Sequence, residues 1–239
     1  MNNETTNKFF LPVAVILAGL FIAGAVIWNG SHPSASSGQA PTAPKVNIAD
    51  VKIDGNPFIG QANAPVTIAF WSDFQCTFCK AFEVGGIPQI TTPAAFPEII
   101  KNYVDTGKVK IVFMDFAFLG NDSVIGAVYS RSIWKLYPDK YFAWRTAMYT
   151  AQDEEGDQGF GNAVSIDKLT ATIPGIDVAK VAADVKANMS IYQTAMDADK
   201  AEAAKVGINA TPSFVIGTQA IAGAYPYASF QTAIDALLK

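Results

Sequence analysis

Two cysteines, Cys76 and Cys79, are the residues whose type and spacing point most directly to chemistry. They are the only cysteines in the 239-residue chain, and they closely follow an apolar, β-like run at residues 66–71. If a helix begins at Cys76, its unpaired N–H groups and macrodipole stabilise a thiolate there. A C-x-x-C pair in that position typically lowers the thiol pKa to about 3.5–7.5. The spacing therefore predicts a dithiol/disulfide exchanger in which Cys76 is the exposed, attacking thiol and Cys79 closes the ring.

Two other uses of the cysteine pair are less well supported. A zinc site usually takes four Cys or His ligands, and the sole histidine, His32, lies in a Ser/Pro-rich tract far from the motif. A purely structural disulfide usually closes a longer loop, because a short loop removes little chain entropy. We expect neither a bound metal nor another cofactor.

Composition places the chain among globular proteins with an ample core. Half of its residues are hydrophobic and 12% are aromatic, and the formal net charge is −4. Because the net charge is negative and gives no basic surface for phosphates, we expect no nucleic-acid partner.

The N-terminal region predicts a membrane anchor. Residues 9–28 contain no charged side chain, and about 20 apolar residues span a bilayer core of roughly 30 Å. We expect residues 1–8 to be cytoplasmic, residues 9–29 to form a single-pass transmembrane helix in the cytoplasmic membrane, and residues 30–55 to be a flexible linker. The alternative is a signal peptide cleaved near Ala25 or Ser36, which would release a secreted protein. In either case the cysteines lie on the extracytoplasmic side, where disulfides persist.

The rest of the chain reads as an α/β domain. The run at 66–71 and a second apolar run at 109–114 predict two parallel strands joined by helical segments, and 213–216 with 220–222 predict a later hairpin. Between them, helices are expected over 124–137, 141–149, 165–173, 177–188 and 191–206, and Pro226 opens a final helix.

Four segments give the chain a resemblance to a known family. They are Phe74–Cys79, Asp105–Val109, Asn209–Gly217 and Gly223–Tyr227. With this order of elements, the chain resembles the DsbA-like thiol:disulfide oxidoreductases of the thioredoxin superfamily, in their membrane-anchored bacterial form. The resemblance covers roughly residues 56–239. It implies a thioredoxin fold with an inserted helical domain at about residues 119–204.

The resemblance also suggests roles for individual residues. It implies that Pro212 is cis and faces the cysteines, so that Thr211, Pro212 and Phe78 belong to a substrate groove. Asp73 and Glu83 are candidate proton acceptors. A solvated carboxylate at a strand end explains Asp73 equally well, and an exposed helix face explains Glu83.

The resemblance implies donation of disulfides to unfolded or partly folded exported proteins that carry thiols, with reoxidation by a DsbB-like, quinone-linked membrane protein. Strongly oxidising relatives often have proline and histidine between the cysteines, where this chain has Thr77 and Phe78. The phenylalanine side chain offers no hydrogen-bond donor to a thiolate, so a disulfide reductase or isomerase with the same site remains the alternative function. A metal-handling module and a non-redox chaperone are more distant alternatives.

Overall fold

The computed structural model describes residues 46–155, 157 and 159–239. The expected anchor at 9–29, the segment before it and most of the expected linker lie outside these residues. Within the described ranges, no helix has both the length and the apolar character needed to cross a membrane.

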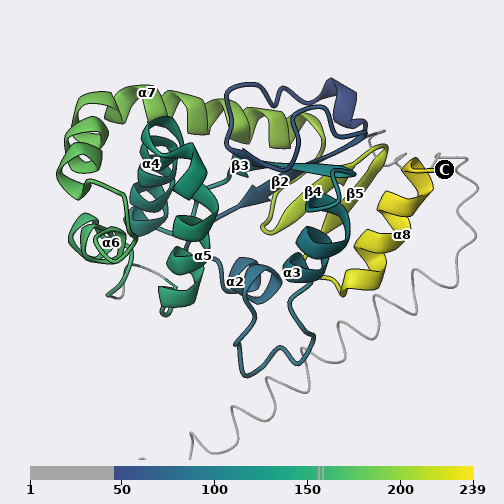
Figure 1. The fold of residues 1–239 in the computed structure, drawn as a ribbon, viewed down its shortest axis with the longest axis horizontal. Helices are drawn as coiled ribbons and strands as arrows, with labels where there is room; N and C mark the ends of the chain where they lie inside the picture. Colours follow the sequence, from purple (N-terminus) through teal and green to yellow (C-terminus); the bar gives the residue numbers. More distant parts are fainter. Residues whose placement is uncertain (1–45, 156, 158) are drawn as a thin grey trace, which may run out of the picture. The chain divides into compact units, whose positions relative to one another are not determined.

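A five-stranded mixed sheet forms the centre of the fold (Figure 1). Its strands are β1 (Phe58–Ile59), β2 (Val66–Ser72), β3 (Val109–Asp115), β4 (Ser213–Ile216) and β5 (Gln219–Ala222), in the spatial order β1-β3-β2-β4-β5. The pairing of β2 with β3 is parallel, which confirms the expectation from the two apolar runs, and every other pairing is antiparallel. The short edge strand β1 was not expected.

Helices of different lengths connect and cover the sheet. They are η1 (Ile48–Asp50), α2 (Thr77–Glu83), α3 (Phe96–Ile99), η2 (Ile100–Val104), α4 (Asn121–Leu136), η3 (Pro138–Lys140), α5 (Tyr141–Ala151), α6 (Ala163–Thr170), α7 (Val178–Lys205) and α8 (Tyr227–Leu237). The elements from α4 to α7 all lie between β3 and β4, and they form the expected helical insertion.

The two faces of the sheet pack into separate apolar clusters, because side chains alternate along a strand. On β2, Phe70 packs with Phe82 of α2 and Phe230 of α8 in the larger cluster, which also includes the core of the insertion. Trp71 points to the opposite face and packs with Ala203 near the end of α7. Helix α7 therefore belongs to the insertion at one end and covers the sheet at the other (Figure 1).

The expectation of two helices over 177–188 and 191–206 is wrong, because a single helix, α7, covers both ranges. No glycine or proline interrupts this stretch. The side chain of Asn188 donates to the backbone oxygen of Asp184 one turn earlier at 2.9 Å, and Tyr192 donates to the Asp184 carboxylate. The polar groups near the expected break are therefore bonded within the helix.

Candidate active site

Strand pairing brings the cysteine motif to the start of β4. The last residues of β2 lie opposite the first residues of β4, with Trp71 paired to Ser213. Because the two strands are antiparallel, the chain leaves β2 toward Cys76 at the same edge where it enters β4 from Thr211. Residues 135 positions apart are therefore neighbours.

Cys76 is the residue that directly precedes α2, and Cys79 lies in the first turn of that helix. The Cys76 thiol donates to the backbone oxygen of Thr211, with Sγ and O 3.4 Å apart. The peptide bond between Thr211 and Pro212 is cis, as the family resemblance implies. The thiol is thus placed against the loop that opens β4.

Both cysteines are free and buried, so the expectation that Cys76 is exposed is wrong. Cys76 is 4% exposed and Cys79 is 0% exposed, because the Thr211 loop packs against the first thiol. Their ionisation differs much more than their exposure. A hydrogen bond from Cys79 lowers the pKa of Cys76 to about 7, against the effect of burial, whereas burial raises the pKa of Cys79 well above its usual value.

Asp73 is buried below the motif, so it is not a solvated carboxylate at the end of a strand. Its oxygens accept the backbone N–H groups of Gln75 at 2.8 Å, Phe118 at 2.9 Å and Leu119 at 3.2 Å. Burial nevertheless raises the pKa of Asp73. The charge of Asp73 also acts on Cys79, where it adds to the rise of the thiol pKa.

Glu83 is also buried, so an exposed helix face does not explain it. Its carboxylate accepts from Nε of Arg145 at 3.0 and 3.1 Å and from Nη2 at 2.5 Å. Arg145 comes from α5 of the insertion and also donates to Ser72 at the end of β2. Burial raises the pKa of Glu83, and the charge of Arg145 opposes that rise. This pair joins the cysteine-bearing helix to the insertion.

Two further residues of the insertion contact the motif backbone, and sequence reasoning missed both. The side-chain amide of Gln152 donates to the backbone oxygens of Phe74 at 2.7 Å and Cys76 at 3.1 Å. The carboxylate of Glu155 accepts the backbone N–H of Thr77 at 3.0 Å. Nothing in their types or spacing marks these residues, because they meet the motif only through the tertiary fold.

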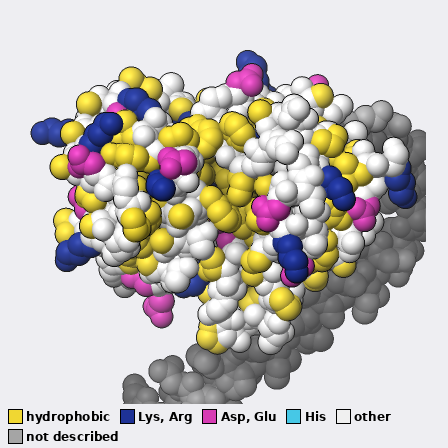
Figure 2. Space-filling view, viewed as in Figure 1, with side chains coloured by type: hydrophobic (Ala, Val, Ile, Leu, Met, Phe, Trp, Pro, Cys, Tyr) yellow, Lys and Arg dark blue, Asp and Glu magenta, His cyan; other side chains and the backbone are white. Residues whose placement is uncertain are grey.

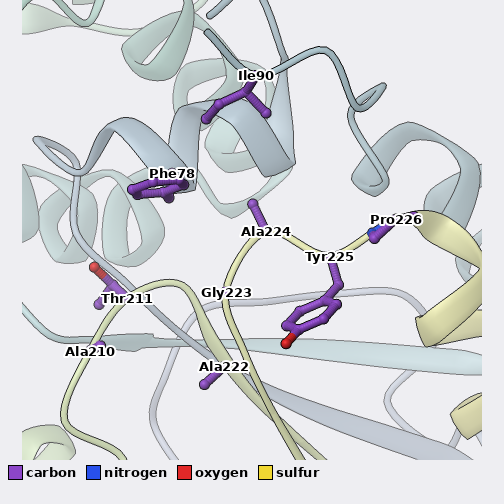
Figure 3. Close-up of a pocket in the computed structure, with 9 residues that line it drawn as sticks. All are labelled: Phe78, Ile90, Ala210, Thr211, Ala222, Gly223, Ala224, Tyr225 and Pro226. Atoms are coloured by element: carbon purple, nitrogen blue, oxygen red, sulfur yellow. The ribbon is translucent and has the colours of Figure 1, made fainter. Parts of the chain in front are cut away.

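An apolar pocket of about 340 Å³ opens beside the cysteine motif. It is lined by Phe78, Ile90, Ala210, Thr211, Ala222, Gly223, Ala224, Tyr225 and Pro226. Figure 3 shows Phe78 and Thr211 on one side of the pocket and Tyr225 on the other. Phe78 is 54% exposed and Tyr225 is 51% exposed. Two of the three expected groove residues therefore line this pocket, while Pro212 does not.

More hydrophobic surface is visible on the molecule. Figure 2 shows hydrophobic side chains gathered in the middle of one face, with charged side chains on either side. Large exposed hydrophobic surfaces commonly mark sites of protein interaction. Among the described residues, no group of three or more His, Cys, Asp or Glu side chains is arranged to hold a metal ion.

Comparisons with known proteins agree with this geometry. A family model described as thioredoxin matches residues 52–236. Disulfide bond formation protein D of Bacillus subtilis is 26% identical over 187 residues, which cover 78% of this chain and 79% of that protein. A probable disulfide bond formation protein D of Bacillus anthracis is 24% identical over 204 residues, covering 85% and 86% of the two chains.

Solved structures show the same fold. The crystal structure of oxidised BdbD from Bacillus subtilis has a TM-score of 0.69 at 23% identity, and the match covers 82% of this chain and 98% of that one. DsbA of Chlamydia trachomatis has a TM-score of 0.65 at 20% identity, with 82% and 97% covered. These matches confirm the α/β fold with a helical insertion. The chain therefore belongs to the thioredoxin family, and within it the chain is similar to the DsbA-like thiol:disulfide oxidoreductases.

Proposed function

We propose that this protein-disulfide oxidoreductase works outside the cytoplasm and donates disulfides to exported proteins through Cys76 and Cys79. The observation that carries the proposal is the contact of the Cys76 thiol with the Thr211 carbonyl, 3.4 Å away, beside an apolar pocket. The chain around a substrate cysteine that reaches Cys76 would meet both the backbone carbonyl of Thr211 and the apolar surface of the pocket. Such a combination suits an unfolded polypeptide.

The proposed reaction exchanges one disulfide for another. In the oxidised enzyme, a substrate thiolate attacks Sγ of Cys76, the Cys76–Cys79 bond breaks, and a mixed disulfide forms. The second substrate thiolate then attacks the substrate sulfur and releases the Cys76 thiolate. The substrate loses two electrons and two protons, and the enzyme ends with two thiols. In the reverse direction Cys76 is the nucleophile and Cys79 resolves the mixed disulfide.

We assign proton transfer at Cys79 to Asp73 rather than to Glu83. The Cys79 sulfur must take a proton when it leaves, because burial strongly disfavours its thiolate. The charge of Asp73 acts directly on Cys79. Both oxygens of Glu83 are instead bonded to Arg145, so we assign Glu83 to holding α2 in place.

Reoxidation needs a second protein that takes two electrons and two protons from the reduced pair. The resemblance to DsbA-like enzymes implies a quinone-linked membrane protein in this role. The charge-free segment at residues 9–28 supports a membrane partner, because an anchor would hold the enzyme in the same membrane as that partner. Cell fractionation tests this: the full chain should be found with membranes, whereas a secreted form starting near Ala25 or Ser36 would support a cleaved signal peptide.

The activity is tested with reduced, unfolded ribonuclease as the substrate. The oxidised full chain should restore ribonuclease activity, and Cys76→Ser should abolish this, while Cys79→Ser should accumulate a mixed disulfide with the substrate. Reduction of insulin without any oxidation of ribonuclease would instead assign a reductase. A double Cys76→Ser/Cys79→Ser variant that still assists ribonuclease refolding would indicate a non-redox chaperone.

A further inference from the structure

We propose that Glu155 sets the redox poise of the cysteine pair by placing a carboxylate on the backbone amide that follows Cys76. The inference rests on the proposed function, because it concerns the direction in which the same site works. Glu155 does not touch the reacting sulfur in this structure, so it acts as a positioning residue through the motif backbone.

The backbone amides after Cys76 have two different surroundings. Those of Phe78 and Cys79 help to lower the pKa of the Cys76 thiol, although the thiol makes no capping hydrogen bond to the helix in this structure. The amide of Thr77 instead donates to Oε1 of Glu155 at 3.0 Å. A carboxylate bonded to the Thr77 amide and a thiolate at the residue directly before it are close like charges, and each disfavours the other.

Contacts on both sides keep Glu155 at this position. Gln152 is bonded to the Phe74 and Cys76 carbonyls. The carboxylate of Asp157 accepts the backbone N–H of Asp122 at the start of α4, at 2.8 Å. The segment that carries Glu155 is therefore tied to the motif before it and to α4 after it.

The other charged or titratable groups around the dithiol do not neutralise Glu155. Asp73 and Cys79 are buried, and neither can carry a positive charge. The ammonium of Lys80 donates to the backbone oxygen of Gln152 at 2.6 Å. Within the described residues, no ion pair joins Glu155 to a cation.

The effect of Glu155 has a definite sign. In the disulfide form Cys76 carries no charge, whereas in the dithiol form near or above pH 7 it is partly a thiolate. The carboxylate therefore destabilises only the reduced enzyme. A less stable reduced form makes the disulfide a weaker oxidant, so Glu155 shifts the pair away from the strongly oxidising end of its family.

Glu155→Gln tests this, because glutamine keeps an oxygen for the Thr77 amide and removes only the charge. The Cys76 pKa, read from thiolate absorbance of the reduced full chain, should fall below the wild-type value. The equilibrium constant for reduction by glutathione should rise by about threefold to tenfold, where tenfold corresponds to about 30 mV. Because Glu155 is exposed, high salt should reduce the difference.

Glu154→Gln is the matched control, since Glu154 is the neighbouring exposed acid and, within the described part of the chain, has no hydrogen bond to the motif. It should leave both quantities near the wild-type values. Equal shifts in the two variants, or an unchanged or raised Cys76 pKa in Glu155→Gln, would overturn the inference. Failure of the wild type to exchange with glutathione would refute the proposed function instead, while the thiolate titration would still test Glu155.

Discussion

Arg145 and Glu83 form an ion pair inside the core, beside the helix that carries the cysteines. Nη2 of Arg145 and Oε1 of Glu83 are 2.5 Å apart, and both side chains are almost fully buried. The guanidinium also lies over the ring of Phe113, 4.1 Å from its centroid. The pair therefore connects α5 of the insertion with α2 and with the sheet.

Removing one partner of this pair should be costly. Arg145→Met leaves the Glu83 carboxylate buried without a counter-charge, and we expect a loss of about 3–5 kcal/mol in the free energy of unfolding. Urea unfolding of the variant measures this. Lys135→Met is the control, because Lys135 pairs with Asp184 while its side chain is 50% exposed, and such pairs contribute about 0–1 kcal/mol. Equal losses in the two variants would contradict the structural role of Arg145.

The reactivity of Cys76 should depend on pH and on its partner thiol. Because its pKa lies at about 7, alkylation of the reduced protein should accelerate as the pH rises through 7, while Cys79 stays slow. Cys79→Ala removes the donor that contributes most to this pKa and should raise it, whereas Cys79→Ser keeps a donor and should raise it less. Mass spectrometry after timed alkylation gives both rates. Faster labelling of Cys79 than of Cys76 would reverse the roles of the two thiols.

Phe78 should limit how oxidising the pair is. The side chain of Phe78, two positions after Cys76, cannot donate to a thiolate, so we expect a potential between about −270 mV and −120 mV, the values for thioredoxin and DsbA. Phe78→His should raise the potential by supplying a donor. Val164→His, at another exposed apolar position, should not. Equilibration with glutathione measures all three proteins, and a wild-type value at or below that of thioredoxin would favour a reductase.

Gln152 should hold the motif backbone in its reactive geometry. In Gln152→Ala the buried carbonyl of Phe74 loses its donor, and an unsatisfied buried group costs about 1–3 kcal/mol. The Cys76 carbonyl loses one of its two donors and keeps the Lys80 N–H at 3.1 Å. We expect lower stability in urea and slower disulfide exchange. Gln231→Ala, on the exposed side of α8, is the control and should change neither. Unchanged exchange in Gln152→Ala would show that the motif holds its geometry without this contact.

The local elements of this protein were predictable from its sequence. The strand before Cys76, the parallel strand at 109–114 and the hairpin at 213–222 are marked by apolar runs and turn residues, which act over a few positions. The cysteine spacing alone predicted the exchange chemistry. The cis bond before Pro212 followed from the family resemblance, since no local pattern in the chain marks it.

The tertiary structure decided the surroundings of the two thiols. Glu83 and Asp73 looked compatible with exposed positions, yet both are buried, because the insertion folds over them and supplies Arg145 to one and the Leu119 amide to the other. Gln152 and Glu155 reach the motif from more than 70 positions away. Such contacts depend on how the insertion packs against α2, and packing between distant segments leaves no periodic signal in the chain. The sequence by itself therefore determined the local elements and the spacing of the two cysteines, and the tertiary structure determined the charges and hydrogen bonds around them.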